Sequence, residues 1–130
     1  MIIFNQTVMK FSRLETIAVE IVAAVQHKLP PQLRGLAEGL PVHCQRTPGP
    51  EILPDAYSPD LLGLFDGPAH GEDPGENPVP PQIFLYLDNL WDYADREAAA
   101  FREEVRLTYL HELGHYLGWD EDEVAARGLE

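Results

Sequence analysis

Apolar residues recur every three or four positions between residues 11 and 29 of the chain. This spacing predicts a helix with one face on a core. Ser12 followed by Glu15 forms a capping-box pattern at its start, and Pro30 and Pro31 would stop it. The residues that make up the stripe are Phe11, Leu14, Ala18, Ile21, Val22, Val25 and Leu29.

The next segments predict a short helix and then strands. Residues 32–38 are expected to form the helix, with Gly39 as a natural end. Alternating apolar and polar residues over 41–46 predict a short strand, and the apolar island at 61–65 could form another. The run IFLYL, residues 83–87, is continuously apolar and bounded by turn signals, which is typical of a buried strand.

The last part of the chain predicts a loop, a turn and a long helix. Residues 67–81 are rich in proline and glycine, so they should form a loop, either functional or a mobile surface excursion. Residues 88–95 suggest a turn that includes about one helical turn. Good helix formers fill 96–117, and Gly118 would end that helix. Its expected core positions are Phe101, Val105, Leu110, Leu113 and Leu117.

The order of helix, strands and helix favours an α+β fold, with one small sheet covered mainly by helices. A chain of 130 residues that is 45% hydrophobic suits one domain with one core. The single cysteine, Cys44, excludes an intrachain disulfide and is expected to serve as a small core hydrophobe.

Charge narrows the classes of partner. The formal net charge of −13 should repel nucleic acid phosphates and anionic membrane surfaces, so neither partner is expected. No run approaches eighteen consecutive apolar residues, and the first residues lack the features of a signal peptide. We therefore expect a cytoplasmic location.

The helix at 96–117 carries a candidate metal site. His111 and His115 lie four positions apart, so both imidazoles can point from one helix face to a single ion. Glu112 lies about 100° round the helix from His111, which suits a base for a metal-activated water better than a ligand. The H-E-x-x-H pattern therefore predicts a zinc hydrolase site.

A zinc site of this kind needs a third protein ligand. Gly118 can adopt a positive φ and turn the chain back beneath the metal, which brings Glu121 into reach. The rival ligands are Asp120, Asp122 and Glu123, and Asp120 could instead accept a hydrogen bond from a ligand histidine. In the alternative reading, the acidic run merely solvates and caps a final helix over 122–127.

The segment HELGHYLGWDE resembles the H-E-x-x-H-x-x-G-x-x-D motif of the minimal zincin-like metallopeptidases. Three upstream segments also resemble that family, and together they cover the chain from about residue 9, leaving residues 1–8 as an extension before a single domain, 9–130. They are HKLPPQLRGL (27–36), LLGLFDG (61–67) and IFLYLDNL (83–90).

The resemblance implies a small mixed sheet packed with helices and an active-site helix near the C-terminus. It implies Zn²⁺ held by His111, His115 and an acid, with Glu112 as the base. Glu121 stands where the family usually has aspartate. The function implied is a zinc metallopeptidase whose partner is a peptide or protein substrate. The strand at 83–87 would lie near the cleft; a plain core strand is favoured over pairing with an extended substrate.

Other functional roles stay open from the residues alone. Tyr109, Tyr116 and His70 are candidates for stabilising an oxyanion, although helix aromatics are usually core residues. A rival resemblance is to the metal-dependent endoribonucleases that mature ribosomal RNA, from which the chain departs through Glu112, where those enzymes have glycine, and through its acidic surface.

A non-catalytic zinc-binding module is the third possibility. Structural zinc sites are usually closed by four protein ligands. A fourth ligand would have to come from Asp120, Glu123 or His70.

Overall fold

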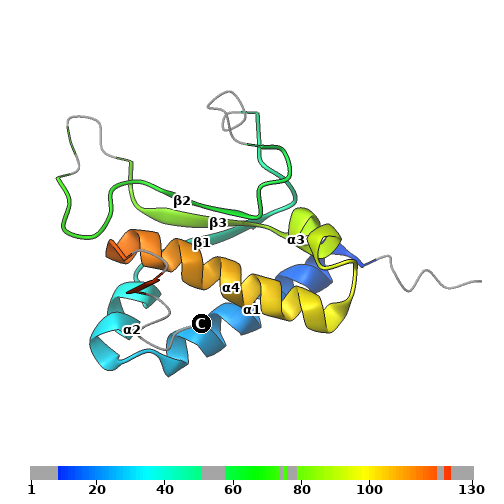
Figure 1. Cartoon of the computed structure of the whole chain (residues 1–130), viewed down its shortest axis with the longest axis horizontal. Coiled ribbons are helices and arrows are strands. Elements are labelled where there is room, and N and C mark those ends of the chain that lie inside the picture. The colour runs from blue at the N-terminus through cyan, green and yellow to red at the C-terminus, as the bar shows by residue number, and fades with distance from the viewer. Residues whose placement is uncertain (1–8, 51–57, 74, 76–78, 120–121, 124–130) are drawn as a thin grey trace, which may run out of the picture.

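A three-stranded sheet packs on one side against helices (Figure 1). The computed structural model describes residues 9–50, 58–73, 75, 79–119 and 122–123. The predicted α+β class is confirmed. The elements in chain order are α1 (Phe11–Lys28), α2 (Pro31–Glu38), β1 (Val42–Gln45), β2 (Gly63–Asp66), β3 (Gln82–Tyr86), α3 (Leu87–Tyr93) and α4 (Ala98–Leu117).

The sheet is mixed and has the order β1-β3-β2. β1 runs parallel to β3, with Cys44 opposite Leu85, and β2 runs antiparallel to β3, with Gly63 opposite the same residue. Because β3 is bonded on both sides, it has no edge to offer an extended peptide. The core-strand interpretation of this segment is confirmed, and its alternative role in pairing with substrate is wrong. In the part of the chain that the structure describes, β2 pairs on one side only.

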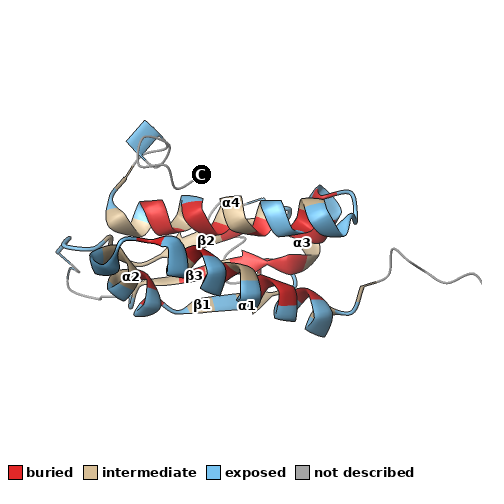
Figure 2. Ribbon diagram, turned by 90° about the horizontal axis from the view of Figure 1, so that it is seen from below, coloured by how far each residue is buried: buried red, intermediate tan, exposed pale blue. Residues whose placement is uncertain are grey.

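Helices α1 and α4 lie side by side on the same face of the sheet (Figures 1 and 2). The three-and-four spacing correctly predicted the inner face of α1, which buries Leu14, Ile17, Ala18, Val22 and Val25. The inner face of α4 buries Phe101, Val105, Tyr109, Leu110 and Leu113. These side chains and the central strand form one continuous core.

The helix ends follow local chemistry. α1 begins at Phe11 after Lys10, which makes no side-chain cap, so the predicted Ser12 capping box is wrong. Ser12 is instead the second residue of the helix. α2 begins at Pro31, where the missing N–H and fixed φ of proline suit the first helical position. Gly118 ends α4 in the left-handed conformation, with φ 77°, as predicted.

Glycine allows β2 to lie unusually close to α4. A Cβ atom at Gly63 would lie 2.6 Å from Cγ2 of Thr108 and 3.6 Å from Cγ of Glu112. Real Cβ atoms essentially never approach another heavy atom within 3.0 Å. The absent side chain therefore brings the edge strand directly onto the helix face that carries Glu112.

Three smaller expectations complete the comparison with the sequence. α3 has seven residues and is longer than the single helical turn expected after the central strand. Cys44 is half-buried against the core, and burial, with the charge of Glu15, raises the pKa of its thiol to about 11. None of the described helices combines the length and apolar character that crossing a lipid bilayer requires.

Candidate metal centre

The last two turns of α4 present two imidazoles to solvent. His111 and His115 are both exposed, and their Nε2 atoms lie 3.1 Å apart. The rings meet edge to face with centroids 4.6 Å apart. Since residues four apart share one helix face, the helix itself brings the two rings together.

The spacing of these nitrogens suits a zinc ion. Two nitrogens bound to one tetrahedral zinc at about 2.0 to 2.1 Å would lie about 3.3 Å apart. The ligand atoms of His111, Glu112 and His115 all lie within 4.8 Å of one another, and these three form the group that could hold a metal ion among the described residues. Two imidazoles beside a carboxylate are a donor set that zinc accepts.

Glu112 is fixed by the edge strand. Its Oε1 accepts a hydrogen bond of 2.8 Å from the main-chain N–H of Phe65 in β2, and its Oε2 lies 4.0 Å from Nε2 of His111. Burial raises the pKa of this carboxyl group above its ordinary value, while the charges of His115 and His111 and the Phe65 hydrogen bond oppose that rise. The hydrogen bond to Oε1 thus orients the Glu112 carboxylate, and Oε2 faces the two imidazoles.

A cleft of about 440 Å³ opens beside this group. The loop after β2 helps to form its wall and is tied to α4, because the N–H of His70 donates to the carbonyl of Tyr116 at 2.6 Å. The Tyr116 ring packs between those of Phe65 and His70, with each pair of centroids 5.7 Å apart. The residues that line the cleft are Leu61, Gly63, Leu64, Phe65, Gly67, Ala69, Glu72, Glu112 and His115.

The predicted site residues fall into two sets. His111, Glu112 and His115 come together as expected. Of the candidate third ligands, Asp120 and Glu121 lie outside the described residues. Asp122 and Glu123 are described and do not belong to the metal group.

Among the other candidates, Tyr109 has no access to the cleft. It is fully buried, and its hydroxyl accepts a hydrogen bond of 3.0 Å from Gln26, so its proposed oxyanion role is wrong. His70 does not belong to the described metal group. Residue types do not predict the Phe65 amide as part of the site, because every residue except proline carries the same main-chain donor.

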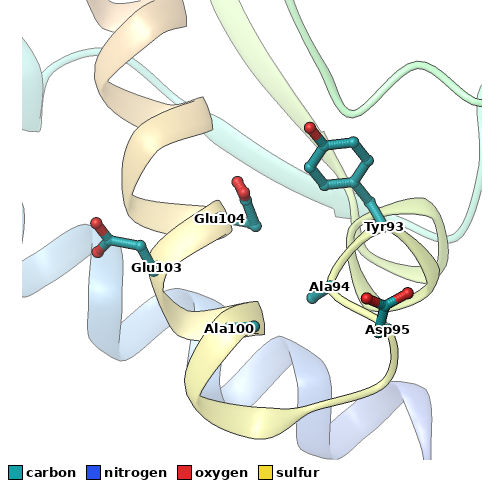
Figure 3. Close-up of a pocket in the computed structure, with 6 residues that line it drawn as sticks. All are labelled: Tyr93, Ala94, Asp95, Ala100, Glu103 and Glu104. Atoms are coloured by element: carbon teal, nitrogen blue, oxygen red, sulfur yellow. The ribbon is translucent and has the colours of Figure 1, made fainter.

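A second, smaller cavity of about 200 Å³ lies between the end of α3 and the first turns of α4 (Figure 3). Tyr93 and Asp95 line it from one side, and Glu103 and Glu104 line it from α4. Glu104 is seven positions before His111, or about 10 Å along the helix axis. This cavity holds carboxylates without an imidazole, and no metal-binding group was found there among the described residues.

Comparison with known proteins agrees with this geometry. The sequence profile of the family described as zincin-like metallopeptidase matches residues 50–129, which is more than half of the chain. The chain belongs to this family. The zincin match covers β2, the loop after it and α4, which supply the residues that line the cleft. No curated protein matches the chain significantly.

Proposed function

We propose that this zincin-like chain is a zinc-dependent peptidase in which Glu112 is the general base. His111 and His115 would hold the ion, with Glu121 as the third ligand and Asp120 as the alternative. The observation that carries the proposal is the position of the Glu112 carboxylate, which is held by β2 at one oxygen and lies 4.0 Å from the imidazole pair at the other.

Zinc, when bound, supplies Lewis-acid chemistry: it lowers the pKa of a water ligand and polarises a carbonyl oxygen. The residues of the chain supply orientation and proton transfer. Glu112 Oε2 would take a proton from the attacking water and return it to the leaving amine. The Phe65 amide keeps the side chain of Glu112 in one rotamer, so little reorganisation is needed when a water arrives.

The edge of β2 suits an extended peptide. Antiparallel strands direct the N–H and C=O groups of alternate residues to opposite sides, and Leu62 accepts a bond from Tyr86 on the β3 side. Gly63 and Phe65 therefore direct theirs to the other side, where the Phe65 N–H already donates to Glu112. The Phe65 carbonyl and both main-chain groups of Gly63 face a peptide on that side. A peptide laid along this edge would place its own carbonyl groups near Glu112.

Charge favours a peptide over RNA. The net charge is −13, and none of the residues lining the cleft is a lysine or an arginine. Proteins that bind nucleic acid usually place basic groups on the phosphates. We therefore propose a peptide substrate, and cleavage of RNA is an outcome that the test below can detect.

The test is a comparison of Glu112→Gln with wild type, both loaded with zinc and checked by elemental analysis. Hydrolysis of a quenched-fluorescence peptide library should fall by about 10²- to 10⁴-fold in the variant, because a general base contributes about that factor. Bound zinc should stay near one per chain. Glu104→Gln, a neutralised carboxylate two turns earlier on α4, should leave the rate within about twofold.

Three results would contradict the proposal. Zinc that leaves with the Glu112 substitution would make this residue a ligand, and undiminished peptide hydrolysis would remove its role as base. Cleavage of RNA without cleavage of peptides would establish the nuclease instead. Zinc titration of Glu121→Ala and Asp120→Ala would then identify the third ligand by the larger loss of affinity.

A further inference from the structure

The cleft is lined by apolar residues and by a second carboxylate besides Glu112. Leu61, Leu64 and Ala69 provide apolar surface on the same cleft that Glu112 and His115 line, and Glu72 is the third charged or titratable group there. A volume of about 440 Å³ is large enough for one long side chain. The cleft therefore combines apolar surface with a carboxylate that the proposed reaction does not use.

Glu72 is held in place by its own turn. Its Oε1 accepts a hydrogen bond of 2.8 Å from the N–H of Ala69, and its own N–H donates to the carbonyl of Ala69 at 3.0 Å. These contacts use one carboxylate oxygen and fix the direction of the group. The side chain is exposed, so it is open to an incoming group.

The surrounding sequence strengthens the negative field. Residues 47–95, which include β2, the loop and β3, contain ten acidic residues and no lysine or arginine. Arg46 and Arg96 flank this stretch, and they pair with Asp88 and Asp92 rather than with Glu72. A cationic group would thus meet no lysine or arginine among the residues that line the cleft.

We propose that the cleft selects a lysine or arginine beside the scissile bond, and that Glu72 receives its cationic end. The alkyl stem of either residue lies along Leu61, Leu64 and Ala69, as long basic side chains do on apolar surfaces. The charged head reaches Glu72. This inference rests on the proposed peptidase function and names its substrate class.

The experiment compares peptides that differ at one residue flanking the scissile bond, tested on each side in turn. Lysine, norleucine and glutamate separate charge from length. Zinc-loaded wild type should cleave the lysine peptide best and the glutamate peptide worst. An exposed ion pair contributes up to about 1 kcal/mol, so Glu72→Gln should lower the lysine-to-norleucine ratio of kcat/KM about fivefold. Glu72→Lys should reverse the order of lysine and glutamate.

Asp73→Asn is the matched control. It removes the same charge from the next residue, which does not line the cleft. The ratio should shift by less than about twofold in this variant, since a screened charge outside the cleft contributes little. An equal effect of both variants, or no effect of Glu72→Gln, would overturn the inference. So would a loss of zinc affinity in Glu72→Gln, which would make Glu72 a ligand.

A measurement of peptide binding tests this inference separately from the proposed peptidase function. Fluorescence anisotropy with labelled lysine and norleucine peptides on the Glu112→Gln protein needs no hydrolysis. Tighter binding of the lysine peptide that Glu72→Gln weakens would support the inference even if wild type cleaves no peptide. Equal binding of both peptides would overturn it even if wild type is a peptidase.

Discussion

The two ends of α4 carry similar residues in different surroundings. The first turns present Glu103 and Glu104 beside a small cavity, and Glu103 pairs with Arg106 on the same helix at 2.7 Å. The last turns present Glu112 beside a larger cleft, where it is held by an edge strand and flanked by two imidazoles. Only the second arrangement brings together groups from distant parts of the chain.

The difference shows that environment decides what a carboxylate can do. A hydrogen bond from Arg106 lowers the pKa of Glu103, which lies in solvent. Burial against β2 raises that of Glu112. A base is more useful when its pKa lies nearer the working pH, and this shift requires a neighbouring strand. The end of α4 that carries the proposed base is therefore the end that the sheet edge covers.

The largest contrast should come from one substitution at each end. His111 is exposed, so His111→Ala should remove bound zinc and peptidase activity while changing the unfolding free energy of the metal-free protein by less than about 0.5 kcal/mol. Phe101 is fully buried against the core and contacts Trp91 edge to face. Phe101→Ala should cost about 3 to 5 kcal/mol and leave zinc bound to the folded fraction.

Urea unfolding in a chelator, together with zinc analysis of the folded protein, measures both effects. Zinc retained by His111→Ala would contradict the assignment of this residue as a ligand. Zinc lost from folded Phe101→Ala would mean that the packing of the first turns and the metal centre are coupled, so that the two ends of α4 are not independent.

Local patterns in the sequence predicted much of this arrangement. The apolar spacing predicted α1 and the inner face of α4, and the left-handed end at Gly118 followed from glycine's freedom at positive φ. The spacing of His111 and His115 predicted that their rings would meet, because i and i+4 share a face. Each of these features depends on residues that are close in sequence.

Features that depend on distant residues were missed. Tyr109 is a candidate oxyanion group by sequence alone, because the sequence does not show that Gln26, 83 positions earlier, donates to its hydroxyl in the core. The contact between Phe65 and Glu112 spans 47 positions and uses a main-chain donor. The sequence favours a core strand at 83–87 but leaves pairing with a substrate open, because periodicity identifies a buried strand and does not give the order of strands in the sheet.

A smaller effect should follow from filling the contact between β2 and α4. Gly63→Ala places a Cβ atom 2.6 Å from the Thr108 methyl group and should cost about 1 to 3 kcal/mol through overpacking. Adding Thr108→Ser removes that methyl group and should restore part of the loss. The coupling between the two substitutions, measured by urea unfolding of the four proteins, should exceed about 0.5 kcal/mol.

Gly35→Ala is the control for Gly63→Ala. No atom lies within 4 Å of a Cβ atom at this helical position, so alanine should be neutral or stabilising there. Equal costs at both glycines would contradict the close approach of β2 to α4. Independent effects of Gly63→Ala and Thr108→Ser would do the same.

The smallest effect should be on the pH dependence of stability. In the metal-free protein, the carboxylates at the two ends of α4 should change the free energy of unfolding in opposite directions as the pH rises. The pKa of Glu112 is raised on folding, so its contribution to stability is present below the ordinary glutamate range and is lost as the pH rises through the folded pKa. The pKa of Glu103 is lowered, so its contribution is present above that range and is lost as the pH falls.

Raising the pH from 4 to 7 should therefore increase the free energy of unfolding of Glu112→Gln relative to that of wild type. The same change should decrease that of Glu103→Gln relative to wild type. Urea unfolding in a chelator at both pH values gives the two differences. If they share a sign, burial against β2 does not govern Glu112, and the contrast between the two ends of α4 rests on the imidazoles alone.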